Sequence, residues 1–507
     1  MNDVAWLTIL CLLPAIGAAL VLLLPAAQRA LAKRVGLGCA VAVLAVALVL
    51  AVRFDSGGPR YQFAESHHWI PAFGAGYTLG LDGIALVLVL LTVVLVPLLM
   101  LAGWDDPTDG DRATHIYVAL MLAVEAMVLV SLVALDVLLF YVVFEAMLIP
   151  MYFLIGAYGG ALRSQAALKF VLYNLFGGLV MLAAVIGLYV VTAREGHGTF
   201  DSRELVIRTQ HGDATTLRLL FLGFMIAFAI KAPLWPFHTW LPGVATAAKP
   251  ATAVLMMAVV DKVGTFGMLR YCLQLFPDAS AYFRPLIITL SVISIVYCAI
   301  VAIGQTDVMR LIAYVSISHF GFIVLGIFAM TSQGQAGSTL YMVNHGISTA
   351  ALLLIAGFLT SRRGTRAIAA FGGLQKVAPV MAGTFLVAGL ATMALPGLAP
   401  FISEFLVLIG TFTRYPLAAL TGSSTLVLSA IYVLWLYQRM MTGPVSPGND
   451  CVRDLVRREL VVVAPLIALL LVLGVYPKPA LDVINPAVNQ TLTTINQHDP
   501  APKAVAK

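Results

Sequence analysis

Residues 231–242 read KAPLWPFHTWLP and residues 395–405 read LPGLAPFISEF. Each stretch sets prolines beside one ionisable residue, Lys231 in the first and Glu404 in the second, inside an otherwise apolar run. Proline removes a backbone donor and clashes with the preceding turn, so both helices should be discontinuous. Ionisable groups on broken membrane helices are typical of transport sites, where freed backbone groups line a hydrated cavity.

The rest of the chain is equally apolar. Of its 507 residues 61% are hydrophobic and 11% are charged, whereas a soluble domain carries about 25% charged residues. Apolar runs of about 20 residues, long enough to cross a bilayer, recur along the chain, and the first is interpreted as a retained helix rather than a signal peptide. We therefore expect an all-α polytopic membrane protein with about 14 transmembrane helices. The expected spans are 4–25, 34–52, 83–104, 115–135, 137–158, 167–192, 217–241, 252–275, 284–304, 308–330, 337–360, 380–411, 418–441 and 459–476.

Spacing predicts an internal repeat. Glu145 and Lys231 stand 86 positions apart (231 − 145), and His319 and Glu404 stand 85 apart (404 − 319), and the members of each pair are two spans apart with one span between them. Spans four to eight and nine to thirteen then form two five-helix repeats, and because five is odd the second must be inverted. The predicted parts are N-terminal helices at 1–110, a first repeat at 115–275, a second repeat at 284–441, and a C-terminal helix with a tail at 459–507.

Ionisable residues inside the apolar runs are the candidate functional groups, since each costs about 2.5–3.5 kcal/mol at a helix centre. Taken alone, Glu145 and Lys231 also have an interpretation as a structural pair between helices, and a single buried histidine is more often a packing residue. The repeated spacing favours a function instead. The candidates are Glu125, Glu145, Lys231, Asp261, Lys262, His319, His345 and Glu404.

Other motifs have structural interpretations. The five cysteines form no CxxC pair and no Cys/His cluster, so neither an iron-sulfur nor a zinc site is supported. AYGGAL and LFGGLV lack the context of a phosphate loop and suit a turn and close helix packing. Asp136 stands at a predicted helix start as an N-cap. The tail after Pro477 is expected to be partly disordered.

Basic residues near the ends of the spans predict the orientation. They follow spans one, five, eleven and thirteen, which all end on one side, so that side is expected in the cytoplasm and both termini outside. Loop 193–216, with Arg194, Arg203 and Arg208, opposes this assignment. The supporting residues are Arg29, Lys33, Arg34, Arg163, Lys169, Arg362, Arg363, Arg366, Lys376, Arg439, Arg453, Arg457 and Arg458.

Five stretches carry a family resemblance that runs from about residue 80 to residue 441. The chain resembles the antiporter-like subunits of respiratory complex I, which are themselves similar to Mrp-type cation/proton antiporter subunits. A glutamate on the broken twelfth helix, as Glu404 here, indicates the M type (chain 4), because the other two types carry lysine there. The stretches are FYVVFEAMLIPMYFLIGAY (140–158), KAPLWPFHTWLP (231–242), LIAYVSISHFGF (311–322), NHGIS (344–348) and LPGLAPFISEFLVL (395–408).

The resemblance implies a proton relay. Glu145 and Lys231 would be a coupled acid and base, and Glu404 the terminal carboxylate. The links between them would be Lys262, His319 and His345, and Glu125 matches a glutamate for which helix pairing and a catalytic role both stay open.

The resemblance also implies the setting. The chain would be a non-redox subunit of the proton-translocating NADH:quinone oxidoreductase, without a complete catalytic site, metal or cofactor of its own. FMN, iron-sulfur clusters and quinone would belong to partner subunits. The partners would be other membrane-arm subunits, above all the two other antiporter-like subunits, together with the lipid bilayer of a bacterial inner membrane, and no nucleic acid.

Two alternatives were weighed. An Mrp-type sodium/proton antiporter subunit would show the same repeat, but FEAMLIPMY together with Glu404 favours complex I. A scaffold subunit is disfavoured because every relay position holds an ionisable group. The chain departs from the family at Gly243, since HTWLPDAH is usual where HTWLPGVA stands here, so a role for that aspartate does not carry over. Asp261 and Lys249 are additional charges with no expected role.

Overall fold

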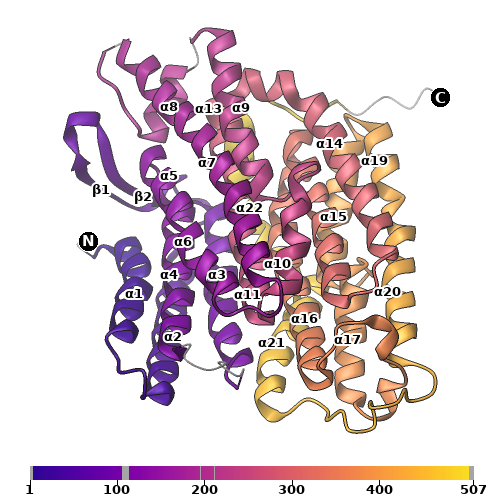
Figure 1. The fold of residues 1–507 in the computed structure, drawn as a ribbon. Coiled ribbons are helices and arrows are strands. Elements are labelled where there is room, and N and C mark those ends of the chain that lie inside the picture. Colours follow the sequence, from indigo (N-terminus) through magenta and orange to yellow (C-terminus); the bar gives the residue numbers. More distant parts are fainter. Residues whose placement is uncertain (1–3, 106–112, 195, 210–211, 502–507) are drawn as a thin grey trace, which may run out of the picture.

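The computed structural model describes residues 4–105, 113–194, 196–209 and 212–501. These residues form a bundle of helices with one two-stranded hairpin at its edge (Figure 1). In the described part of the chain, 12 helices are long and apolar enough to cross a membrane, and three shorter apolar helices accompany them. The predicted all-α membrane fold is confirmed. Every predicted span overlaps one of these helices or a consecutive pair, while the number of crossings stays a prediction.

The N-terminal part contains a hairpin that caps the first helix. The Glu65 carboxylate accepts hydrogen bonds from the backbone N–H groups of Leu7 (2.8 Å) and Thr8 (3.3 Å), which have no partner inside the helix. The strands pair antiparallel, from Gln62 with Leu81 to Ile70 with Ala75. The elements are α1 (Trp6–Leu22), α2 (Arg29–Arg53), β1 (Gln62–Ile70), η1 (Pro71–Phe73), β2 (Ala75–Leu81) and α3 (Gly83–Ala102).

The first predicted repeat contains the first helix break. Helix α9 ends at Lys231, and helical structure resumes only at Phe237, because Pro233 and Pro236 lie between them. The next span is one continuous run with two π-helical turns, η4 and η5. The elements are α4 (Thr114–Val133), α5 (Val137–Ala146), α6 (Leu148–Gly156), α7 (Arg163–Arg194), α8 (Ser202–Arg208), α9 (Ala214–Lys231), η3 (Phe237–Trp240), α10 (Leu241–Ala247), α11 (Pro250–Val254), η4 (Leu255–Val260), α12 (Asp261–Gly267), η5 (Met268–Cys272) and α13 (Leu273–Leu275).

The second predicted repeat contains the second break, at residues 393–398 between α17 and α18. Each predicted repeat thus contains one broken helix, with the break after Lys231 in the first and before Glu404 in the second, while the repeat and its inverted symmetry stay predictions. The elements are α14 (Pro277–Ile303), α15 (Val308–Ala329), α16 (Ser332–Arg363), η6 (Ile368–Ala370), η7 (Leu374–Lys376), α17 (Pro379–Thr392), α18 (Ala399–Phe412), α19 (Pro416–Ser423), α20 (Thr425–Met441), α21 (Arg457–Val475) and α22 (Lys478–Thr494).

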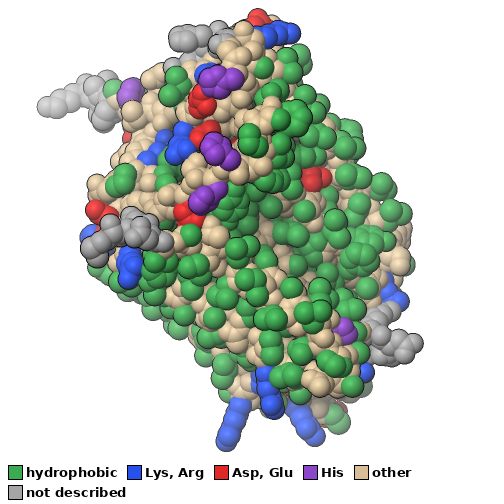
Figure 2. Space-filling view, turned by 90° about the vertical axis from the view of Figure 1, so that its left-hand side faces the viewer, with side chains coloured by type: hydrophobic (Ala, Val, Ile, Leu, Met, Phe, Trp, Pro, Cys, Tyr) green, Lys and Arg blue, Asp and Glu red, His purple; other side chains and the backbone are tan. Residues whose placement is uncertain are grey.

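The core lies along the span 250–275 and helices α15 and α16, whose residues are almost all buried. Outer helices such as α2, α7 and α20 expose apolar side chains. Figure 2 shows hydrophobic side chains over most of one face, with Lys and Arg at its lower end and, together with Asp, Glu and His, along its upper left part. This distribution is the one expected of a membrane-embedded surface.

The predicted disorder after Pro477 is wrong for residues 478–494, which form α22. This helix buries Ile484, Val488 and Leu492, a stripe at four-residue spacing that indicates an amphipathic helix. It packs against α3, where Val483 O lies so close to Gly83 that a Cβ there would approach it to 2.0 Å. The final residues, 502–507, lie outside the described residues, as do 106–110 of the predicted N-terminal part, and the predicted domain boundaries stay predictions.

Candidate functional site

Lys231 is buried at the end of α9 and faces the end of α5. Its Nζ donates to Phe144 O at 3.2 Å and lies 4.2 Å from the centroid of the Phe144 ring. Glu145 is the next residue and interacts with Lys231 electrostatically. Among the ion pairs of the described residues, defined at 4.0 Å, Glu145 and Lys231 do not appear. The two groups are therefore neighbours rather than a closed salt bridge.

Glu145 is half-buried and lies against Gly178 of α7. A Cβ at Gly178 would come within 2.0 Å of Glu145 Oε1, so only glycine leaves room for this carboxylate. The LFGGLV stretch thus permits close packing, as the sequence predicts. On its outer side Glu145 borders a hollow of about 450 Å³ that Ile149, Tyr152 and Leu175 also line. Glu145 is therefore part of the lining of this hollow, although its Oε1 atom is buried.

The protein itself satisfies the backbone groups that the first break frees. Ile230 O accepts a hydrogen bond from the Trp240 indole at 3.1 Å, and Leu234 N donates to Ala229 O at 2.9 Å. Buried backbone groups need such partners in a membrane. These bonds hold Lys231 at a defined position.

Lys262 is buried in α12 and joins the two predicted repeats. Its Nζ lies 2.6 Å from His345 Nδ1 on α16, donates to Met257 O at 3.1 Å, and lies 4.0 Å from the Phe320 ring centroid. The π-helical turns η4 and η5 stand on either side of α12. Such turns frequently occur at functional sites, and no pattern in the sequence predicts them.

From His345 the row continues to Glu404. The ring centroid of His319 lies 5.4 Å from that of His345 and 5.6 Å from that of Tyr341. The Tyr341 hydroxyl donates to Glu404 Oε2 at 3.2 Å, and Ser316 Oγ lies 3.0 Å from His345 Nε2. All these groups are buried.

The order along this row, and two of its members, escaped the sequence reasoning. His345, rather than His319, adjoins Lys262. Tyr341 stands four residues before His345, so the two side chains share one helix face. This spacing is the sequence pattern from which a role for Tyr341 could have been predicted. Ser316 offered no comparable signal, because its contact with His345 joins two different helices.

Asparagine 344, in the NHGIS stretch, anchors the second break. Asn344 Nδ2 donates to Ala399 O at 2.7 Å and to Ser403 Oγ at 3.3 Å. These residues begin α18, which carries Glu404. The break and the neighbouring helix α16 are therefore fixed relative to each other.

Glu125 is fully buried in α4, away from this row. Both carboxylate oxygens lack a hydrogen-bond partner within the described residues, and Cys39 is a neighbouring group with which it interacts electrostatically. The two interpretations of Glu125 therefore stay open.

The structure also shows the surroundings of three other residues named from the sequence: Asp136, Gly243 and Lys249. Asp136 caps α5 by accepting from Leu139 N at 2.9 Å, as the sequence predicts. Gly243 has open space where a Cβ would stand. Lys249 Nζ lies 5.4 Å from the Tyr117 ring centroid.

One buried ion pair was not anticipated from the sequence. Arg270 of η5 lies 2.8 Å from Asp82, and both side chains are about 2% exposed. Asp82 also caps α3 by accepting from Ala85 N at 2.8 Å. The pair ties α3 to the central span.

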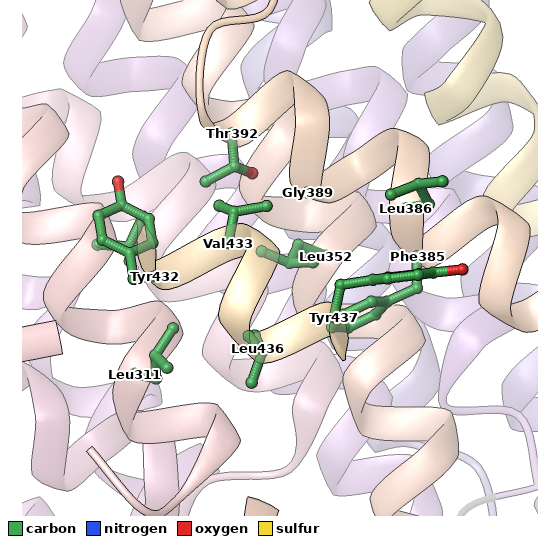
Figure 3. A pocket seen from close by; sticks show the side chains of 11 residues that line it. Leu311, Leu352, Phe385, Leu386, Gly389, Thr392, Tyr432, Val433, Leu436 and Tyr437 are labelled. Carbon is green, nitrogen blue, oxygen red and sulfur yellow. The ribbon is translucent and has the colours of Figure 1, made fainter. Parts of the chain in front are cut away.

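A narrow crevice between α15, α16, α17 and α20 holds about 10 Å³, close to the lower limit for one water molecule. Figure 3 shows that apolar side chains such as Leu352, Val433 and Leu436 line most of it. This crevice offers no site for a cofactor. Within the described ranges, no three His, Cys, Asp or Glu side chains are grouped as metal ligands.

The helical membrane fold, its two broken helices and the buried row of acids and bases define an antiporter-like membrane subunit. Residues 134–429 match the family described as NADH:quinone oxidoreductase/Mrp antiporter, transmembrane. The chain is 66% identical to NADH-quinone oxidoreductase subunit M of Mycobacterium tuberculosis (strain H37Rv), over 99% of this chain and 96% of that protein. The chain belongs to the subunit M family of NADH-quinone oxidoreductase, the antiporter-like membrane-arm subunits of respiratory complex I. Its partners are other subunits of that complex.

Two solved structures are similar to this chain along most of its length. A chain of respiratory complex I from Thermus thermophilus matches with a TM-score of 0.87 and 31% identity, over 96% of this chain and 99% of that chain. A chain of the Mrp complex from Dietzia matches with a TM-score of 0.80 and 23% identity, over 94% of this chain and 52% of that chain, which shows a shared fold alone. The complex I interpretation is therefore favoured over the Mrp alternative.

Proposed function

We propose that this subunit moves protons across the membrane through the buried row from Glu145 to Glu404. The observation that carries the proposal is the contact of 2.6 Å between Lys262 Nζ and His345 Nδ1. It connects the ionisable groups of the first predicted repeat to those of the second. The proposed relay consists of Glu145, Lys231, Lys262, His345, His319, Tyr341 and Glu404.

The proposed driving step is a change in the distance between Glu145 and Lys231. Burial disfavours a charged lysine, and a nearby carboxylate restores that form, so moving the carboxylate changes how tightly Lys231 holds its proton. Two charges 4 Å apart interact by about 4 kcal/mol at an effective dielectric constant of 20. Moving one charge through 100 mV costs about 2.3 kcal/mol. The interaction is therefore large enough to drive the transfer.

The contact between Lys262 and His345 then carries the proton between the repeats. When Lys262 is an ammonium and His345 is neutral, an N–H bond at Nζ breaks and one forms at Nδ1. His345 holds Ser316 Oγ at its other nitrogen, so a proton can leave on that side without rotation of the ring. Histidine suits this place because its unperturbed pKa is near 6.5.

The energy for pumping would come from partner subunits, where FMN, the iron-sulfur clusters and quinone belong. The hollow beside Glu145 supports a neighbouring membrane subunit at this face, since its rim exposes Ile149 at 61% and Tyr152 at 41%. The two other antiporter-like subunits are the proposed neighbours. A change in such a neighbour would reach Glu145 directly.

We further propose a bacterial inner membrane, with both termini on its outer side. Basic connections meet at one end of the bundle, where Arg362 pairs with Glu459 at 2.6 Å and Arg458 donates to Ala102 O at 2.9 Å. The basic loop 193–216 opposes this orientation. Arg203 pairs with Asp201 and Arg208 with Glu204, but acidic partners contribute little to the orientation rule.

The test is proton pumping by the assembled complex in proteoliposomes during NADH oxidation. Lys231→Met and Glu404→Ala should each lower the ratio of protons pumped to electrons transferred. A full ratio in either variant would overturn the proposed relay.

A further inference from the structure

Asp261 is a fully buried carboxylate that is not a member of the proposed relay. Both oxygens lack a hydrogen-bond partner within the described residues, and the side chain is 0% exposed. Burying an unpaired carboxylate costs several kcal/mol. A charge kept in such a place needs an electrostatic partner or a function.

The backbone of α12 directs Asp261 toward the break in α9. Gly264 packs against that break, because a Cβ there would lie 3.0 Å from both Ala232 N and Phe228 O. Residues three apart share a helix face, so Asp261 lies one turn before Gly264 on the face that meets α9. Its carboxylate interacts electrostatically with Lys231 accordingly.

Lys262, although adjacent in sequence, points to the other predicted repeat. Consecutive helical residues do not face each other, and the Lys262 ammonium is held by His345 and Met257 O. Within the described residues no ion pair at 4.0 Å includes Asp261. Asp261 interacts electrostatically with Lys262 first and with Lys231 second. Helix α12 therefore holds a carboxylate without an ion pair between two lysines, and the Lys262 ammonium also contacts His345.

We propose that Asp261 is a second carboxylate partner of Lys231 and carries the proton from Lys231 to Lys262. Lys231 then stands between Glu145 on α5 and Asp261 on α12, and its ammonium approaches one as it leaves the other. The inference rests on the proposed function.

The proposed transfer takes place in two steps, and each step breaks one bond to the proton and forms another. An N–H bond of the Lys231 ammonium breaks as an O–H bond forms on Asp261, which leaves a neutral amine and a neutral acid. The O–H bond then breaks as an N–H bond forms on the neutral Lys262 amine, and the Asp261 carboxylate is restored. Asp261 interacts electrostatically with both Lys231 and Lys262, so each transfer joins two coupled groups.

The test compares Asp261→Asn with Lys231→Met in the assembled complex in proteoliposomes. Asparagine keeps the size of the side chain and removes its charge. The expected result is an assembled, NADH-oxidising complex whose ratio of protons to electrons falls to that of Lys231→Met. Asp261→Glu should restore most of the lost ratio, which a purely structural role would not predict. Asp278→Asn, the same change at an exposed position, is the matched control and should keep the full ratio.

The outcomes separate the two proposals. A full ratio in Asp261→Asn beside a reduced ratio in Lys231→Met overturns the role of Asp261 and leaves the relay standing. Failure of Asp261→Asn to assemble also overturns it, since the carboxylate would then be a structural charge. A full ratio in Lys231→Met overturns the relay itself.

Discussion

Lys262 Nζ and His345 Nδ1 lie 2.6 Å apart although the residues are separated by 83 positions in the chain. Lys262 belongs to α12 and His345 to α16, so the contact crosses the boundary between the two predicted repeats. A proton passing from one repeat to the other needs a link of this kind. The first prediction concerns this link.

His345→Phe keeps a ring of similar shape but removes both nitrogens. We expect the complex to assemble and oxidise NADH while the share of pumped protons that depends on this subunit is lost, because Lys262 has no acceptor on α16. The measurement is the proton-to-electron ratio in proteoliposomes. His67→Phe, at an exposed position of β1, is the control, and an unchanged ratio in His345→Phe would exclude the link.

Tyr341→Phe removes the hydroxyl that donates to Glu404 Oε2 at 3.2 Å. Hydrogen bonds to charged groups contribute about 1.5–3 kcal/mol, and each 1.36 kcal/mol corresponds to about tenfold in rate. We expect pumping to slow by about tenfold or more with little effect on assembly. The initial rate of proton uptake measures this. Tyr437→Phe, which lines the surface crevice of Figure 3, should pump normally, and equal rates in the two variants would refute a role for Tyr341.

Gly178→Ala changes no charge but displaces Glu145, because the new Cβ would stand 2.0 Å from its Oε1. We expect a reduced proton-to-electron ratio, since the carboxylate can no longer hold its distance from Lys231. Gly243→Ala is the matched control, as a Cβ there meets open space. Normal pumping by Gly178→Ala would show that the position of Glu145 is not critical.

Asp82→Ala leaves Arg270 buried without its carboxylate partner. Breaking a buried ion pair by removing one member costs about 3–5 kcal/mol, so we expect a clearly lower unfolding temperature and poor assembly. Thermal unfolding of the purified complex, followed for this subunit, measures the loss. Lys478→Ala breaks the exposed pair with Asp482 and should leave the unfolding temperature unchanged. A stable Asp82→Ala variant would mean that water reaches Arg270.

Local chemistry made several features predictable from sequence. Clustered prolines break a helix, so KAPLWPFHTWLP and LPGLAPFISEF predict both breaks, whereas a single proline such as Pro97 stays inside the continuous helix α3. Asp136 was recognised as an N-cap because its position relative to the apolar run is local information. Composition does not predict the helix at 478–494, because Pro, Asn and Thr favour disorder there, although its apolar stripe of Ile484, Val488 and Leu492 is local information as well.

The sequence by itself determined a membrane protein with two broken helices and a set of buried ionisable residues, because hydrophobicity, proline and charge act through each residue and its near neighbours. Only the tertiary structure decided that Lys262 meets His345, that Tyr341 reaches Glu404, that Asp82 pairs with Arg270, and that Asp261 faces α9. Each of these contacts joins helices far apart in the chain, and their angles and depths depend on how all the helices pack together.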